Sequence, residues 1–382
     1  MKVLLTIFLF CLPLTAQDAR LAALRRTIMA MREAPDVSRE TRGATPELTV
    51  AKHQVRDWVE GHLTKFAKDG DEAALAQTIH DEIRDAQLFC TDFYIECYPS
   101  NRGFLDEVRI NRDQEFLIIR TAVGIWCGYD YSAYVYRWNN TGWQRIWANE
   151  QNTYTEKSYR PQILHAVQIS MPDAGGNRLL LTLGAQPGCS GGFQPVYYRV
   201  FPMNARYQVQ RAVLDANEYL NVAFDPPIEG RIEPDDLLLE INVGGTGYGE
   251  SHRALRHFEI RNGRARQVDP IARTPRDFVE EWLAAPWSQS VTRAESPDLR
   301  QWHVKLHRDD GQGTYPDPAM RCTSSAELWQ VGLRWHEGPK TYYLVRWKEP
   351  WHFTMVGISD RAYPDCTVTD PKGDDHPPLF NP

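Results

Sequence analysis

The chain has 382 residues, enough for two domains or for one large β domain with an appendage. It carries 43 lysines and arginines against 50 aspartates and glutamates, a net charge of −7. This balance lacks the basic surface of a nucleic-acid-binding protein and does not suit an anionic membrane, so neither partner is expected.

The sequence begins with a segment typical of a secretory signal peptide. Residues 1–16 read MKVLLTIFLFCLPLTA, with Lys2, an apolar run and the small residue Ala16. The run is shorter than the ~20 residues of a membrane-spanning helix, and no later stretch approaches that length without a charge. Cys11 follows Phe10 rather than a small residue, which argues against lipid attachment. We therefore expect a secreted or periplasmic protein without a membrane span.

Residues 17–97 have the pattern of a helical region. Thr45-Pro46-Glu47 supplies a cap residue followed by proline at the first helical position, and apolar residues then recur at helical spacing. A second stripe consists of Leu75, Ile79, Ile83 and Ala86. Each predicted helix has one apolar face, so both should pack against another element.

Residues 98–370 contain a repeat of short β segments. Four apolar segments are alike, at residues 115–124, 177–185, 235–245 and 326–334. Each is preceded by another β segment, at residues 105–110, 163–169, 219–224 and 300–306. Each is also followed, after a loop, by a hairpin, which predicts four strands in about 60 residues. The predicted units cover residues 103–150, 162–215, 218–270 and 298–360. Such a repeat is typical of a β-propeller, here with about four blades, and a pair of stacked sandwiches is the alternative.

The longer spacing before the last unit holds a predicted helical insertion at residues 274–286. Thr274 and Pro275 supply its cap and its first-turn proline. Residues 371–382 are predicted to be a flexible tail. The predicted fold class is therefore mainly β: repeated four-stranded antiparallel units, β-propeller-like, after an N-terminal α-helical segment.

The second unit carries a family resemblance. Residues 170–201 read SMPDAGGNRLLLTLGAQPGCSGGFQPVYYRVF, with an acidic glycine turn, a leucine-rich strand, a glycine loop and an aromatic strand. This segment resembles a blade of the FG-GAP and VCBS-type β-propellers. Those families commonly carry a calcium loop with several aspartates at alternate positions, whereas Asp173 stands almost alone here. The resemblance implies a propeller, and we expect no calcium or other cofactor.

The stretch Gly188-Cys189-Ser190-Gly191-Gly192 matches the G-x-S-x-G pattern of a nucleophile elbow. Such an elbow requires a helix directly after the serine, whereas residues 193–201 are predicted to be a strand. A catalytic serine also needs a base, and none is evident upstream. We therefore predict no covalent chemistry at Ser190 and no catalytic residue elsewhere.

No metal site is predicted either. The histidines His53, His62 and His80 lack the H-E-x-x-H spacing. His303 and His307 share one face of a predicted strand, where about 13 Å separates them. The run at 307–313 is interpreted as a solvated turn, and the acidic residues between 233 and 240 as a charged edge.

After the signal peptide, the six cysteines predict disulfides, because the chain has no closely spaced C-x-x-C pair for a metal. Cys127 and Cys189 occupy equivalent loops of adjacent units and are predicted to pair. The remaining predicted pairs are Cys90 with Cys97 and Cys322 with Cys366.

Aromatic residues gather in the loops between the second and third strands of the units. A propeller would bring these loops to one rim, while the hairpin turns at 139–142, 204–206 and 262–263 would share the other. The predicted ligand-binding rim comprises Trp126, Tyr129, Asp130, Tyr131, Phe193, Tyr248 and His252. Packing between blades is the alternative role for these rings.

These patterns favour an exported, non-enzymatic binding protein whose partner is a protein or a glycan. Two alternatives remain: a secreted or envelope hydrolase acting on polysaccharide or peptide, and a structural envelope component. Fold alone does not separate these classes, because propellers host both binding proteins and enzymes.

Overall fold

The computed structural model describes residues 16–33, 46–88, 105–125, 128–152, 163–185, 193–221, 228–243, 252–303, 314–335, 338–348 and 350–369. Residues 1–15 of the predicted signal peptide (1–16) and the predicted tail lie outside them. The chain divides into two compact units, residues 1–162 and 163–382. Among the described residues, none of the helices has the length and apolar character needed to cross a bilayer. The predicted fold class is confirmed: helices come first, followed by repeated antiparallel sheets.

Unit 1 begins with the predicted helices, which form a bundle on one sheet. The helices are α1 (Ala16–Glu33), α2 (Pro46–Leu63) and α3 (Glu72–Asp85). The second starts at Pro46, as the cap pattern predicts, and the third is capped by Asp71, whose carboxylate accepts from the Ala73 amide at 2.9 Å. Most residues of their apolar stripes are buried, with Trp58 at 0% exposure, while Ala86 is partly buried.

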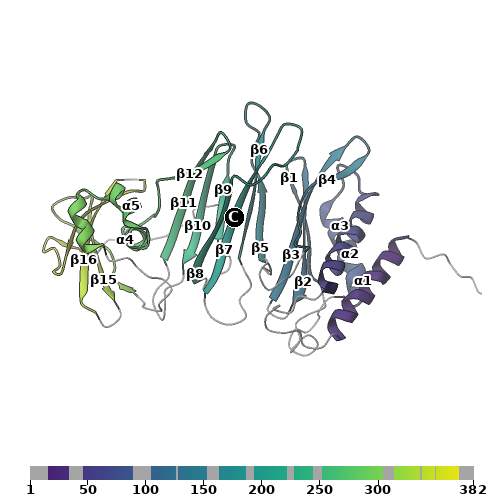
Figure 1. The fold of residues 1–382 in the computed structure, drawn as a ribbon, viewed down its shortest axis with the longest axis horizontal. Coiled ribbons are helices and arrows are strands. Elements are labelled where there is room, and N and C mark those ends of the chain that lie inside the picture. The colour runs from purple at the N-terminus through teal and green to yellow at the C-terminus, as the bar shows by residue number, and fades with distance from the viewer. Residues whose placement is uncertain are drawn as a thin grey trace, which may run out of the picture. The chain divides into compact units, whose positions relative to one another are not determined.

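The sheet of unit 1 has the strand order β1-β2-β3-β4, all antiparallel. Its strands are β1 (Leu105–Asp113), β2 (Phe116–Ile125), β3 (Gly128–Asn139) and β4 (Gly142–Asn149). The three helices cover it and share its apolar core (Figure 1). Because the helices and the first sheet share this core, they belong to one unit. The domain boundary predicted from the sequence falls between them, after residue 97.

Unit 2 opens with two further four-stranded antiparallel sheets. The first contains β5 (Ile163–Ile169), β6 (Arg178–Ala185), β7 (Phe193–Met203) and β8 (Leu214–Asn221). The second contains β9 (Ile228–Ile232), β10 (Asp236–Val243), β11 (His252–Arg261) and β12 (Arg264–Val268). Their facing sides form one apolar core that includes Leu181, Tyr198 and Leu239. The predicted turn Asn262-Gly263 is present, and both residues have positive φ, 52° and 69°, as a two-residue hairpin requires.

The boundary between these two sheets differs from the prediction. Residues 219–224 are predicted as the first strand of the next unit, but β8 extends to Asn221 and pairs with β7.

The turn at Asn204 folds locally, because its side-chain oxygen accepts from the Arg206 and Gln208 amides at 2.9 and 3.0 Å. The true first strand, β9, is short and contains Gly230, where a Cβ would lie 2.4 Å from the Leu239 side chain. Its small residue and short length hide it from pattern analysis.

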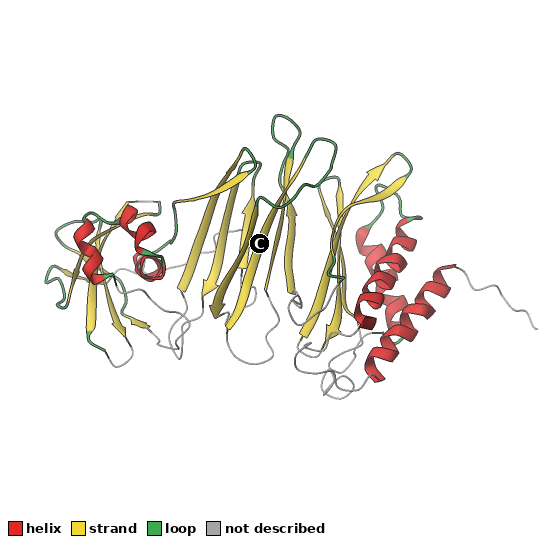
Figure 2. Cartoon of the chain, in the orientation of Figure 1, coloured by secondary structure: helices red, strands yellow, loops and turns green. Residues whose placement is uncertain are grey.

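The predicted insertion forms α4 (Pro275–Ala284), capped by Thr274. It is followed by α5 (Trp287–Ser290), η2 (Val291–Arg293) and η3 (Pro297–Trp302). Within unit 2, the described helices occur only in this segment (Figure 2). The apolar face of α4, including Phe278 and Trp282, packs on the last sheet.

The last sheet is larger than the four strands predicted. It contains β13 (Thr314–Pro316), β14 (Met320–Cys322), β15 (Leu328–Trp335), β16 (Lys340–Lys348), β17 (His352–Ser359) and β18 (Cys366–Thr369). The predicted strand at 300–306 is wrong in its first half, since residues 297–302 form η3. Ser296 caps this helix and Pro297 occupies its first turn, a start signal that outweighs the short alternating pattern. His303 ends the helix, and His307 lies outside the described residues.

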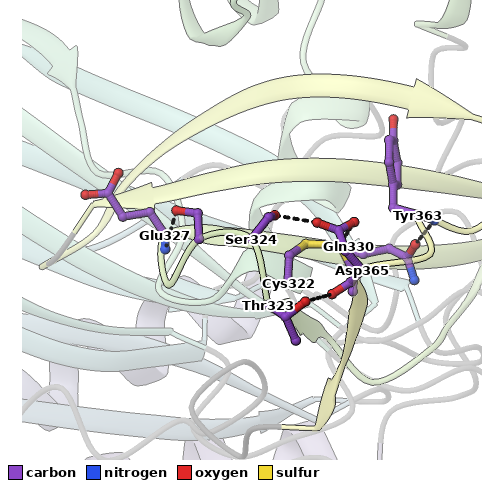
Figure 3. Close-up of a disulfide and its surroundings, with 9 residues drawn as sticks. Cys322, Thr323, Ser324, Glu327, Gln330, Tyr363 and Asp365 are labelled. Atoms are coloured by element: carbon purple, nitrogen blue, oxygen red, sulfur yellow. Dashed lines mark hydrogen bonds between the residues drawn. A yellow bond between two sulfur atoms is a disulfide. The ribbon is translucent and has the colours of Figure 1, made fainter.

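A disulfide joins Cys322 of β14 to Cys366 of β18, as predicted (Figure 3). The two cysteines face each other across paired strands, with a sequence separation of 44 residues. Asp365 fixes the same corner, because its side chain accepts from the Ser324 hydroxyl and its carbonyl accepts from the Thr323 amide at 2.8 Å. The other predicted pairs, Cys90 with Cys97 and Cys127 with Cys189, lie outside the described residues.

Candidate functional site

Of the predicted binding residues, only some are described. Trp126 and Tyr248 lie outside the described residues, as does Ser190. Phe193 begins β7, and nothing is described of its side chain. Tyr129 and Tyr131 lie half-buried in β3, with their rings edge-to-face and centroids 6.4 Å apart. Their role in ligand binding stays a prediction.

Asp130 is buried, contrary to the exposure that a ligand-binding role at a rim requires. Its side chain is 0% exposed and lies 2.9 Å from Lys52 Nζ on α2. The same ammonium group donates to the Gln151 carbonyl at 3.0 Å. A buried charge needs a partner of opposite sign, and Lys52 supplies it. Asp130 therefore holds a helix against its sheet.

Lys52 belongs to a polar stripe on α2 whose members are four residues apart. Arg56 Nη1 lies 2.7 Å from Glu150 Oε2, which follows β4. Glu60 accepts from Tyr136 Oη at 3.0 Å and from Arg145 Nη1 at 2.8 Å. Residues at this spacing share one face of a helix, so the stripe attaches that face to β3 and β4.

His252 is also buried, at 3% exposure, between two neighbouring carboxylates of α4. Its Nδ1 lies 2.7 Å from Glu280 Oε2 and its Nε2 lies 2.9 Å from Glu281 Oε1. An ionised carboxylate only accepts hydrogen bonds, and a neutral imidazole has only one N–H. The imidazole of His252 therefore has a carboxylate of α4 on each side, whichever ring nitrogen carries the proton.

Arg256 extends this network to the neighbouring sheet. It contacts Glu281 at 2.9 Å and binds both oxygens of Glu218 on β8, which also accepts from Tyr198 Oη at 2.6 Å. Burial acts to lower the pKa of Arg256, but Glu281 and Glu218 outweigh it and raise that pKa well above its usual range. Burial likewise acts to raise the pKa of Glu218, but Arg256 outweighs it and lowers that pKa. Both groups are thus held in their charged forms.

A further carboxylate, Glu240 of β10, completes the network. It contacts Arg253, and Arg273 Nη1 lies 2.7 Å from its second oxygen. Asp277 at the start of α4 accepts from the Arg253 amide at 3.1 Å. Every described carboxylate of this network has a cationic or hydrogen-bonding partner inside the protein. The arrangement attaches α4 to β11.

An open cavity of about 280 Å³ lies between the two core-sharing sheets of unit 2, at their turns. Its floor is apolar and buried, formed by Leu179, Met203 and Ile260. Its walls come from the turns after β5, β7, β9 and β11. The polar lining residues are Asp173, Asn177, Arg178, Asn204, Gln210 and Asn262. This turn cavity combines an apolar base with converging polar groups, the composition of a small-ligand site.

Asp173 shapes one wall of the turn cavity. Its Oδ1 accepts from the Gly175 and Asn177 amides at 2.8 and 2.7 Å, and its Oδ2 accepts from Asn177 Nδ2 at 3.0 Å. The Asn177 side chain and these amides lower the pKa of Asp173. Arg178 donates from Nη1 to the Ser170 carbonyl at 3.1 Å. The two charged groups of the turn cavity are therefore held partly by their own turn.

Gln210 and Asn262 are exposed lining residues from the segments after β7 and β11. Within the described part of the chain, their side-chain amides make no hydrogen bond. Each amide offers two N–H donors and one carbonyl acceptor. They are the groups of the turn cavity that are open to a ligand.

The turn cavity is lined by hairpin turns, whereas the sequence predicts a solvated rim at these turns and a binding face at the aromatic rim. One signal was present: asparagine and aspartate recur in these turns, at 173, 177, 204 and 262. Such residues commonly serve the turn itself, as Asn204 does, so their convergence becomes visible only in three dimensions.

Comparisons with known proteins show similarity in fold only. No protein-family model matches the chain. No curated protein sequence matches it either. Among solved structures it is similar to a protein described as a glycoside hydrolase, at 10% identity and a TM-score of 0.23, over 66% of this chain and 72% of that one.

Two other solved structures are similar at the same level. One is a polysaccharide lyase, an ulvan lyase bound to -[GlcA(1-4)Rha3S]-, at 9% identity and a TM-score of 0.25, over 67% of this chain and 56% of that one. The other is an endo-1,4-beta-xylanase from Bacteroides thetaiotaomicron, at 10% identity and a TM-score of 0.16, over 68% and 97%. The resemblance to polysaccharide-degrading enzymes is weak, and no site or activity is transferred from it.

Proposed function

We propose that this protein is an exported binding protein that recognises a glycan at the turn cavity. The observation that carries the proposal is the pair of open amides, Gln210 and Asn262, above the apolar floor. A sugar ring presents hydroxyl groups at its edge and C–H groups on its faces. Amides donate to and accept from hydroxyls, while the small exposed parts of Leu179 and Ile260 contact a C–H face.

The size of the turn cavity supports a small unit. Its 280 Å³ lies just below the range of about 300–1,000 Å³ for drug-sized ligands, so a single sugar ring suits it. Because the lining residues Asp173, Gln210 and Asn262 are exposed, a longer glycan is free to continue into solvent.

Binding without catalysis is the role that this lining supports. Glycoside hydrolysis normally needs two carboxyl groups across the bond, and Asp173 is the one carboxylate in the described lining. Glu280 and Glu281 lie elsewhere, each side chain 6% exposed and paired with His252. Export rests on the signal-like N-terminus, and the disulfide supports it, because such bonds persist in oxidising compartments.

The test is binding to an array of oligosaccharides, followed by titration calorimetry on any sugar that is captured. Gln210→Ala and Asn262→Gly should each weaken binding about threefold to tenfold, the loss of one hydrogen bond. Glycine keeps the positive φ of position 262 without strain. Gln267→Ala on β12 and Asn140→Gly in the equivalent turn of unit 1 are matched controls and should leave binding unchanged. Retained affinity in both turn-cavity variants would refute this site.

A further inference from the structure

The polar groups of the turn cavity also discriminate between glycans. The described lining contains one carboxylate, Asp173, and one guanidinium, Arg178, so its formal charge is zero. The remaining polar lining groups are the uncharged amides of Asn177, Asn204, Gln210 and Asn262. A ligand with a net charge would gain one favourable contact there and meet one repulsive contact.

The two charged groups are not equally available to a ligand. Arg178 spends at least one N–H on the Ser170 carbonyl. Asp173 accepts hydrogen bonds from three groups of its own turn, the Gly175 amide, the Asn177 amide and Asn177 Nδ2, but it remains exposed and ionised. An exposed carboxylate repels a nearby uronate or sulfate, and the net charge of −7 adds to this repulsion.

We infer that the turn cavity takes an uncharged sugar unit, and that Asp173 is the residue that excludes uronate-bearing and sulfated glycans. This inference rests on the proposed function and narrows its ligand class. A free amino acid is the rival ligand, since its ammonium and carboxylate could meet Asp173 and Arg178. The hydrogen bonds already made by both residues disfavour it, whereas the open amides of Gln210 and Asn262 suit hydroxyl groups.

The experiment compares four sets of probes on the full chain by titration calorimetry: neutral oligosaccharides, uronate-bearing oligosaccharides, sulfated oligosaccharides and free amino acids. The neutral set should bind the unaltered protein, with the anionic sets at least tenfold weaker. Asp173→Asn keeps a carbonyl oxygen for the Gly175 and Asn177 amides but removes the charge. It should strengthen binding of the anionic sets about tenfold and change neutral binding less than threefold.

Asp235→Asn is the matched control, because it removes the same charge from an exposed residue outside the lining. It should change no affinity. Equal gains in Asp173→Asn and Asp235→Asn would show a general charge effect and overturn the role of Asp173. Preferred binding of anionic sugars or amino acids that Gln210→Ala weakens would overturn the inference while keeping the site. If Gln210→Ala and Asn262→Gly change no binding at all, the proposed function itself fails.

Discussion

Helices α2 and α4 each attach to a sheet through charged side chains, but with opposite polarity. In unit 1 the helix supplies the cation, Lys52, and β3 supplies the anion, Asp130. In unit 2 the helix supplies the anions, Glu280 and Glu281, and β11 supplies His252. Asp130 pairs with Val123 across β2 and β3, and His252 pairs with Val243 across β10 and β11. Asp130 and His252 thus occupy equivalent positions in the repeat, and each contacts a helix there. The residue at this position is acidic where the helix supplies a cation and basic where the helix supplies anions.

The two attachments also differ in burial and in shared contacts. Lys52 and Asp130 form an ion pair in which both side chains are 0% exposed. Glu281 contacts His252 and Arg256, and each of these has a second carboxylate partner. His252 also contacts Glu280, and Arg256 also contacts Glu218. We therefore expect the loss of Lys52 in unit 1 to lower the free energy of unfolding more than the loss of Glu281 in unit 2.

The largest expected effect comes from Lys52→Met. It removes the Lys52 ammonium from the fully buried ion pair with Asp130 and should lower the free energy of unfolding by about 3–5 kcal/mol. Calorimetric unfolding of the full chain measures this change. Adding Asp130→Leu should recover most of the loss, because an apolar pair of similar volume replaces a buried ion pair well. Lys65→Met, at an exposed lysine just after α2, is the control, and an equal loss there would contradict the assignment.

Glu281→Gln should have a smaller effect in unit 2. His252 keeps Glu280 and Arg256 keeps Glu218, so we expect a loss of about 1–3 kcal/mol in unfolding free energy. The same calorimetric scan measures it. Glu259→Gln, at a more exposed position of β11, should change nothing measurable. A loss as large as that of Lys52→Met would show that the network lacks the redundancy described above.

Acid should weaken the attachment in unit 2. Burial acts to raise the pKa of Glu218, but Arg256 outweighs burial and holds that pKa below its ordinary value of 4.5. The stabilisation from this pair is therefore fully present above about pH 4.5 and is lost as pH falls through the folded-state pKa. Melting temperatures between pH 3 and pH 7 should show this fall. In Glu218→Gln the melting temperature should fall less steeply with decreasing pH. An unchanged slope would show that the pair of Glu218 and Arg256 does not cause the acid sensitivity.

The smallest effect concerns His257, the second histidine of β11. Burial acts to lower its pKa, but hydrogen bonds to Asp236 and to the Asp269 carbonyl, both at 2.6 Å, raise it above 6.5. Its stabilisation is present below pH 6.5 and is lost as pH rises through the folded-state pKa. A nuclear magnetic resonance titration of the ring should report the raised pKa. Asp236→Asn should lower the pKa of His257. An unchanged pKa would show that another group raises it.

Much of the fold is predictable from the sequence, because periodicity is a local signal. The central strands β2, β6, β10 and β15 and the helices α2 and α4 lie where apolar runs and cap residues place them. The failures have tertiary causes. The strand β9 is short and interrupted by Gly230, and its place depends on contact with Leu239.

The candidate site was less predictable. Asp130 and Lys52 are 78 residues apart, so no local pattern shows that one neutralises the other. Exposure was therefore inferred for two residues, Asp130 and His252, that the structure buries. The turn cavity has the same difficulty, since its lining comes from separate turns spread over residues 173–263.

The bond between Cys322 and Cys366 has a consequence for resistance to proteolysis. It closes a covalent ring that contains β15, β16 and β17. A protease that cut one peptide bond inside this ring would open it without releasing a fragment. The two pieces would stay joined through sulfur, and their strands would remain paired in the sheet. The last sheet is thereby built to tolerate a single nick until a reductant is present.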